Sequence, residues 1–283
     1  MVHCRLIDIF SALAVFVAAA TTANAQDPSK YPDWSGQWTR GPSMGVGWDP
    51  TKPPGLGQQA PLTPEYKALF DSLLADKALG GLGGDPTALC LPHGMPRMMI
   101  GIYPIEFVVT PKVTYVITDY TTHRRIFTDG RAWPGEILPG YNGYSIGKWI
   151  DEDGDGRFGI LEIETRGFKG PRTFEGSGMP LHEDNKTVIR ERIGLDKSNN
   201  NLLRLEATIT DSSLTRPWSI ARTYRRDPNG FWDFVDCAEN NPHVLVGKEY
   251  YMISADGYLM PTKRGQQPPD ARYFNRTPGA AGR

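Results

Sequence analysis

The sequence predicts a mainly β protein, an antiparallel barrel or sandwich with one N-terminal amphipathic helix. Three observations support this fold class. Short runs of alternating polar and apolar residues recur between residues 105 and 236, turn signals separate them, and hardly any helical pattern lies between them. Strands joined by short turns form antiparallel barrels and sandwiches. We favour the barrel, and a single domain accounts for this length of β-rich chain.

Residues 1–25 have the features of a secretory signal peptide. Arg5 lies in a short amino-terminal region, an apolar stretch follows over 9–20, and Ala23-Asn24-Ala25 matches the A-x-A cleavage pattern. The apolar stretch is too short for a membrane-spanning helix, and no other run approaches that length. The sequence therefore predicts a periplasmic or secreted protein with no membrane span.

An arm rich in Pro, Gly and Trp over residues 26–62 leads to the one strong helix pattern. The arm has a short strand pattern over 34–38. Thr63 is the expected N-cap, and Pro64 suits the first helical position. Apolar residues then recur at three- and four-residue spacing up to a Gly-Gly pair, which predicts a helix over about 64–79 with its apolar stripe packed on the core.

Nine β-rich runs follow within a single domain assigned to residues 63–261. Apolar and polar side chains alternate along them, so one face of each strand is expected to point inward. The runs cover residues 105–110, 113–120, 123–128, 143–150, 158–166, 187–195, 202–210, 218–226 and 231–236. Residues 262–283 are polar and rich in Pro and Gly, which predicts a loosely attached tail.

Two strands carry a charge on their apolar face. Glu191 shares its face with three aliphatic residues, and Arg222 shares its face with Trp218, Ile220 and Tyr224. A buried charge is costly unless it is paired. Glu191 and Arg222 are therefore expected to pair with each other or with other buried polar groups. Such a pair is either structural or the polar floor of a ligand cavity.

Two cysteines remain once the signal peptide, which contains Cys4, is removed. Cys90 and Cys237 would be exposed to an oxidising compartment after export, and an isolated pair there predicts one disulfide. The alternative is two buried free thiols.

An acidic loop follows the fourth of these runs. Residues 151–162 match the pattern D-x-D-x-D-G-x5-E of a calcium-binding loop, in which carboxylate oxygens surround a hard cation. Strands flank the loop where an EF-hand has helices, so we expect a calcium clip on a β-hairpin. The alternative is a solvated acidic turn. The expected ligands are Asp151, Asp153, Asp155 and Glu162.

The candidate acid–base residues lie in loops or at strand edges. His123 and His182 are candidates because histidine transfers protons near neutral pH. Asp129 and Arg131 close a hairpin next to His123, and an arginine there is suited to a carboxylate or an oxyanion. The alternative for each is an ordinary surface position. The sequence contains no G-x-S-x-G, Walker or dinucleotide-binding motif, so we expect no organic cofactor.

Several sequence blocks resemble a large, mostly uncharacterised family of secreted bacterial proteins. The resemblance covers roughly residues 86–240 and brings no activity with it. The blocks are Cys90-Leu-Pro-His-Gly-Met-Pro-Arg97, Arg124-Arg-Ile-Phe-Thr-Asp-Gly-Arg131, Gly143-Tyr-Ser-Ile-Gly-Lys-Trp149, Leu161-Glu-Ile-Glu-Thr165, Glu191-Arg192 and Thr215-Arg-Pro-Trp218. In addition, Gly36-Gln37-Trp38 and the late-strand Arg222 resemble the Gly-x-Trp and Arg of lipocalin-like barrels.

Composition limits the function classes. The net charge is −1, from 31 Lys+Arg and 32 Asp+Glu, which argues against a nucleic-acid binder. The expected partner is a small molecule. We expect a cavity for an apolar or aromatic ligand, with Glu191 as acid–base group or polar anchor and Arg222 beside it. Cofactor-free catalysis of the lyase, isomerase or hydratase type, simple binding, and a structural role of the arm remain open.

Overall fold

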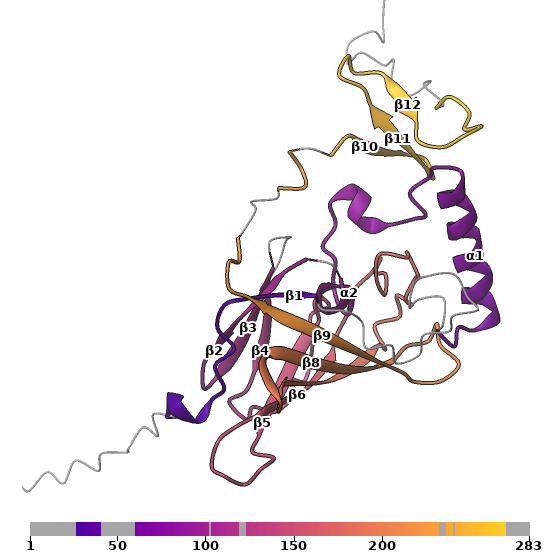
Figure 1. Ribbon diagram of the computed structural model, residues 1–283. Helices are drawn as coiled ribbons and strands as arrows, with labels where there is room; N and C mark the ends of the chain where they lie inside the picture. Colours follow the sequence, from indigo (N-terminus) through magenta and orange to yellow (C-terminus); the bar gives the residue numbers. More distant parts are fainter. Residues whose placement is uncertain are drawn as a thin grey trace, which may run out of the picture.

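The computed structural model describes residues 27–40, 60–101, 103–118, 123–231, 236–239 and 241–269. Nine strands form a closed barrel in sequence order, with the last strand hydrogen-bonded to the first (Figure 1). The predicted mainly β barrel is therefore confirmed. The strands are β1 Gln37–Arg40, β2 Ile105–Val109, β3 Val113–Thr118, β4 Arg124–Phe127, β5 Tyr144–Ile150, β6 Ile160–Arg166, β7 Val188–Asp196, β8 Asn199–Thr210 and β9 Trp218–Asp227.

One pair of neighbouring strands is parallel, so the barrel is mixed rather than fully antiparallel. Ile126 of β4 lies opposite Ser145 of β5, and Phe127 lies opposite Ile146. A parallel pair needs a connection that returns to the starting end of the sheet. Residues 128–143 provide that return here.

The strand that closes the barrel comes from the arm. β1 pairs with both β2 and β9, and Trp38 of β1 donates its Nε1–H to the Trp34 carbonyl oxygen at 2.9 Å. The sequence placed a strand at 34–38 but left it outside the β series. The ninth predicted run, 231–236, falls mostly on 232–235, which lie outside the described residues.

Aromatic side chains fill one end of the barrel. The segment around η1 (Pro28–Lys30) brings Tyr31 and Trp34 beneath the strands. The Trp34 ring lies 5.1 Å from Phe107 and 5.0 Å from Trp149, and Tyr31 lies 5.5 Å from Trp149. Hydrophobic burial and edge-to-face ring contacts stabilise this end.

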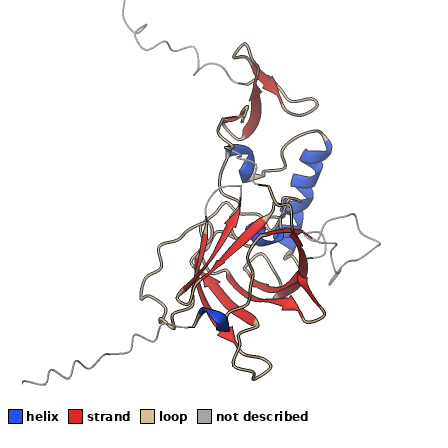
Figure 2. Ribbon diagram, turned by 60° about the vertical axis from the view of Figure 1, so that its left-hand side comes forward, coloured by secondary structure: helices blue, strands red, loops and turns tan. Residues whose placement is uncertain are grey.

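Helices and loops cover the opposite end (Figures 1 and 2). They are α1 (Pro64–Ala78), η3 (Pro86–Leu89) and α2 (Arg97–Ile100). The predicted helix is confirmed, and its cap is too: Thr63 Oγ1 accepts from the Tyr66 N–H at 3.3 Å. Only Phe70 of α1 is buried, so fewer residues of the apolar stripe pack on the core than the sequence predicted. No described helix is long and apolar enough to cross a membrane.

A separate three-stranded sheet follows the barrel. It comprises β10 (His243–Val246), β11 (Glu249–Ile253) and β12 (Leu259–Pro261), and lies beyond α1 in Figure 1. Lys263 links this sheet to α1, with its Nζ 2.7 Å from Asp76 and 2.8 Å from Glu249. Residues 262–269 are thus anchored, whereas the sequence predicted a loose tail; residues 270–283 lie outside the described part.

The predicted disulfide is confirmed. Cys90 is bonded to Cys237, with Cα atoms 5.5 Å apart. Asn241 Nδ2 donates to the Ala88 carbonyl oxygen at 2.8 Å close by. The bond thus fastens the segment after β9 to the cover of the barrel.

Candidate functional site

A buried ion pair lies at the centre of the barrel. The Arg124 guanidinium contacts both carboxylate oxygens of Glu191, one at 3.0 Å, and only 1% and 0% of the two side chains are exposed. Arg124 also donates to Thr165 Oγ1 at 2.8 Å and, through Nε, to Ser145 Oγ at 3.1 Å. A bidentate pair with further hydrogen bonds is the arrangement in which a buried charge is tolerated.

Strand alternation brings these side chains together. Glu191 lies opposite Ile163 of β6 and Ala207 of β8, so all three face the interior. The neighbouring inward positions are small: Gly147 has no room for a Cβ, which would lie 2.7 Å from Ile126 Cγ2. Small inward residues therefore leave space for the long Arg124 side chain to cross the barrel.

Arg222 and Tyr224 place two more polar groups inside. Both are on the inward face of β9, and only 3% and 2% of their surfaces are exposed. Arg222 Nε and the Tyr224 hydroxyl have no hydrogen-bond partner among the described residues. Within the described part of the chain, the Arg222 guanidinium makes one hydrogen bond, to the Ala221 carbonyl oxygen at 3.4 Å. Buried polar groups are nearly always paired, so two neighbouring exceptions require an explanation.

Electrostatics connect these groups. Burial raises the pKa of Tyr224 and the Glu191 charge raises it further, so its hydroxyl stays protonated near neutral pH. Burial lowers the pKa of Arg222, and the Arg40 charge acts in the same direction. Arg40 lies opposite Tyr224 in the β1–β9 ladder. Tyr224 is therefore under the influence of the negative charge of Glu191 and of several arginines, of which Arg40 is exposed.

The late-strand arginine that packs on the Gly-x-Trp tryptophan is Arg226, not Arg222. Its guanidinium carbon lies 4.5 Å from the Trp38 ring centre, and its nitrogens donate to the carbonyl oxygens of Ser35 and, at 2.7 Å, Asp33. Arg226 thus ties the arm to β9 through cation–π and hydrogen-bond contacts. Arg222 is left without that structural role.

Glu191 pairs with Arg124 and not with Arg222. The sequence offered either a mutual pair or separate buried partners, and the structure shows the second for Glu191. The signal for Arg124 was present, because Arg124 and Ile126 share a face of a strand as Glu191 does with its aliphatic neighbours. It was hidden by the adjacent Arg125, since two consecutive arginines suggest an exposed basic turn.

His182 belongs to a second buried network near the covered end. Its backbone N–H donates to Asp211 at 3.0 Å, and its ring Nδ1 accepts from the Asp184 N–H at 3.1 Å. Arg172 donates to the His182 carbonyl oxygen at 3.3 Å and to Thr187, which donates to Asp211 at 2.6 Å. This network shapes a loop, and no contact in the described chain joins His182 to Glu191.

His123, Asp129 and Arg131 lie on the outside. His123 is exposed. Arg131 pairs with Asp129 at 2.6 Å and stacks over Phe127, 3.8 Å from the ring centre. Hydrogen bonds from Arg131 lower the pKa of Asp129 to about 2. The structure thus brings these two residues together, but at a surface turn and not in the barrel with Glu191.

The carboxylates of the acidic loop have other partners. Asp151 accepts from the N–H groups of Gly154 and Gly156 at 2.8 and 2.9 Å. Asp153 pairs with Lys197 at 2.6 Å, and Glu162 pairs with Arg192 at 2.8 Å. The Asp155 carboxylate accepts from the Arg157 N–H at 2.9 Å. The donor set suits a hard cation, but within the described chain no group of three or more potential ligands converges.

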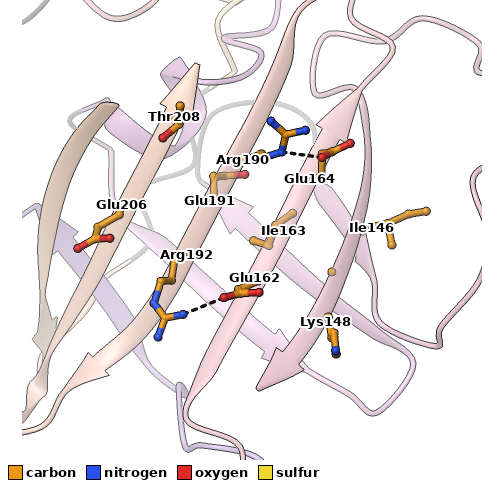
Figure 3. A pocket seen from close by; sticks show the side chains of 11 residues that line it. Ile146, Lys148, Glu162, Ile163, Glu164, Arg190, Glu191, Arg192, Glu206 and Thr208 are labelled. Atoms are coloured by element: carbon orange, nitrogen blue, oxygen red, sulfur yellow. Dashed lines mark hydrogen bonds and ion pairs between the residues drawn. The ribbon is translucent and has the colours of Figure 1, made fainter. Parts of the chain in front are cut away.

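A shallow charged groove runs over the outside of β5 to β8 (Figure 3). It has a volume of about 460 Å³. Arg190 points to Glu164 and Arg192 points to Glu162 across the strands, each at 2.8 Å (Figure 3). Opposite charges that face one another across strands stabilise a sheet modestly. The groove therefore has its charges largely satisfied by its own ladder, unlike the barrel interior.

Comparison of the chain with protein-family models, curated proteins and solved structures finds no match. The resemblance to a family of secreted bacterial proteins therefore stays a prediction. The functional argument rests on the geometry of the barrel.

Proposed function

We propose that this is an exported binding protein whose barrel holds one small apolar or aromatic molecule. Closed barrels of about eight strands have an interior that side chains fill or that holds a single small ligand. The barrel here has nine strands, and its inward positions combine apolar walls with a few polar groups. That combination is typical of small-molecule sites.

The observation that carries the proposal is the pair of unpartnered donors on β9. Arg222 Nε and the Tyr224 hydroxyl are buried inside the barrel, where the charges of the Arg124–Glu191 pair act on Tyr224. If the two side chains served only to stabilise the barrel, apolar residues at these positions would give a more stable protein. A bound molecule with an acceptor group would complete the hydrogen bonding.

The cover of the barrel supports the same proposal. Met98 and Met99 of α2 are buried, as are Met95 and Met179 in the adjoining loops. Methionine side chains are flexible and polarizable, and they adapt to irregular apolar shapes. A cover of this kind is suited to admitting and enclosing an apolar ligand.

Binding is favoured over acid–base catalysis. Both oxygens of Glu191 are engaged by the buried Arg124, an arrangement that suits a structural pair better than a general base. His123 is exposed, and His182 belongs to the loop network. Glu191 is therefore proposed as the polar anchor that holds Arg124, and not as a general base.

Export to the periplasm or the medium is part of the proposal. The A-x-A site after a short apolar stretch supports it. So does the Cys90–Cys237 bond, because such bonds persist in oxidising compartments.

The test uses the neutral fluorescent probe N-phenyl-1-naphthylamine. We expect its fluorescence to rise on binding to the protein purified after export. Ala207→Leu should reduce the affinity at least about tenfold, because Ala207 faces the interior beside Glu191. Thr208→Leu is the matched control, since Thr208 lies on the outer groove (Figure 3). No binding, or equal effects of the two substitutions, would refute a ligand site inside the barrel.

A further inference from the structure

No acidic side chain among the described residues forms an ion pair with the buried Arg222. Among the described buried charges, Glu191 pairs with Arg124 and Asp196 pairs with Arg204. Arg172 reaches Asp211 through the Thr187 hydroxyl. The charge of Glu175 also acts on Arg222. One positive charge inside the barrel is thus left without a counter-ion in direct contact.

A ligand group that pairs with Arg222 and Tyr224 must accept hydrogen bonds. A guanidinium group has only donors, and a protonated tyrosine hydroxyl supplies another. Arg222 and Tyr224 are two residues apart on one face of β9, so their donors are available to the same ligand group. Arg40, opposite Tyr224, adds positive charge at the strand end. An anion with two oxygens matches one guanidinium and one hydroxyl.

The surroundings of this spot are apolar. Trp218 and Ile220 precede Arg222 on the same face, and Phe174 packs on Trp218 with ring centres 4.6 Å apart. Leu205 lies directly opposite Arg222 on β8. A ligand whose charge meets Arg222 therefore has an apolar wall on which to lay the rest of its body.

We propose that the ligand is a small apolar monocarboxylic acid, whose carboxylate binds the Arg222 guanidinium and the Tyr224 hydroxyl. This inference rests on the proposed function, since it names the chemical class of the molecule in the barrel. Guanidinium groups bind carboxylates through two parallel hydrogen bonds, which gives both affinity and orientation. The ligand supplies a counter-ion that no described residue provides.

The experiment compares acids with their neutral counterparts. Binding of decanoate and 3-phenylpropanoate is measured by calorimetry at pH 7.5, beside decan-1-ol and 3-phenylpropan-1-ol. At least one acid should bind about tenfold or more tightly than its alcohol. Arg222→Gln should weaken binding of that acid about 10- to 100-fold, and Tyr224→Phe about 5- to 10-fold. Either change should weaken binding of N-phenyl-1-naphthylamine, which has no carboxylate, less than it weakens binding of the acid.

Arg225→Gln is the control, because it removes the same charge from the outer face of the same strand. Arg222→Lys keeps the positive charge but loses the planar guanidinium group. It should therefore retain part of the acid affinity that Arg222→Gln loses. If the neutral probe binds inside the barrel but acids bind no better than alcohols, the proposed carboxylate is wrong and the proposed function stands. Equal losses of acid affinity in Arg222→Gln and Arg225→Gln would also overturn the proposed carboxylate. Failure of every probe to bind would overturn both proposals.

Discussion

The two inward charges that the sequence singled out have different physical surroundings. Glu191 has both oxygens satisfied by Arg124, whereas Arg222 has a single long hydrogen bond to the backbone. A paired charge contributes specificity at small net cost, but an unpaired one lowers stability. The same type of observation in the sequence therefore leads to opposite expectations for the two residues.

Glu191→Gln should destabilise the protein by about 3–5 kcal/mol, because it leaves the Arg124 charge buried without a partner. Urea unfolding measures the change. Glu162→Gln is the control on the neighbouring strand: its pair with Arg192 is partly exposed and is expected to contribute less than about 1 kcal/mol. Similar losses of stability in both variants would show that the buried pair contributes no more than the partly exposed one.

Arg222→Met should stabilise the ligand-free protein by about 1 kcal/mol or more. The substitution keeps a long, flexible side chain and removes a buried charge that forms no ion pair with a described acidic residue. Functional residues often carry such a stability cost. Thermal unfolding of delipidated protein measures the effect. A melting temperature that falls as far as in Glu191→Gln would mean that Arg222 is a structural partner in the apo state.

The candidate site was partly predictable from alternation. Glu191, Arg222 and Tyr224 were placed on inward faces because polar exceptions interrupt an apolar face, and burial bears this out. Alternation also indicated that Arg124 faces inward, but its pairing with Glu191 was not predictable, since pairing across a barrel depends on strand order and curvature. His123 and Arg131 were assigned to the site by residue type alone. Residue type does not show whether a side chain in a turn points into the barrel or to the solvent.

At the scale of elements, local signals predicted local structure. α1 begins and ends close to where its cap and glycine pair indicate, and β6 and β8 bury the predicted faces. The parallel β4–β5 pair was missed because direction depends on the path of residues 128–143. The arm strand was not placed in the barrel either, since four residues have little pattern and their pairing with β9 is long-range.

Calcium binding by the loop between β5 and β6 remains a prediction at this scale. Binding requires Asp153 to leave Lys197 and Glu162 to leave Arg192. The melting temperature should rise with calcium, by the equivalent of about 2.7 kcal/mol at a hundred times Kd, and fall with chelator. Lys197→Ala should enhance the rise by removing a competing cation, and Asp153→Ala should abolish it. No shift at millimolar calcium in wild type and Lys197→Ala alike would exclude the site.

At the scale of the whole molecule, one covalent bond encloses almost the entire barrel. Cys90 lies in the cover and Cys237 follows β9, so β2 to β9 lie within a loop of 147 residues in sequence. The barrel itself closes only through the short strand β1, which contributes four residues. The bond and this strand therefore restrain the same long segment from its two ends.

Replacing Cys90 and Cys237 with serine should lower the stability of the barrel as a whole. The loop-entropy model gives a loss of about 4–5 kcal/mol for a loop of this length, and measured losses are commonly about 2–4 kcal/mol. Because the barrel strands share one core, unfolding should remain a single transition at a lower denaturant concentration. Denaturant unfolding followed by tryptophan fluorescence measures it. The opposite result is an unchanged barrel transition with proteolysis confined to residues 241–269. It would mean that the bond holds only the C-terminal sheet, because the loop constraint acts on the unfolded barrel and not on that sheet alone.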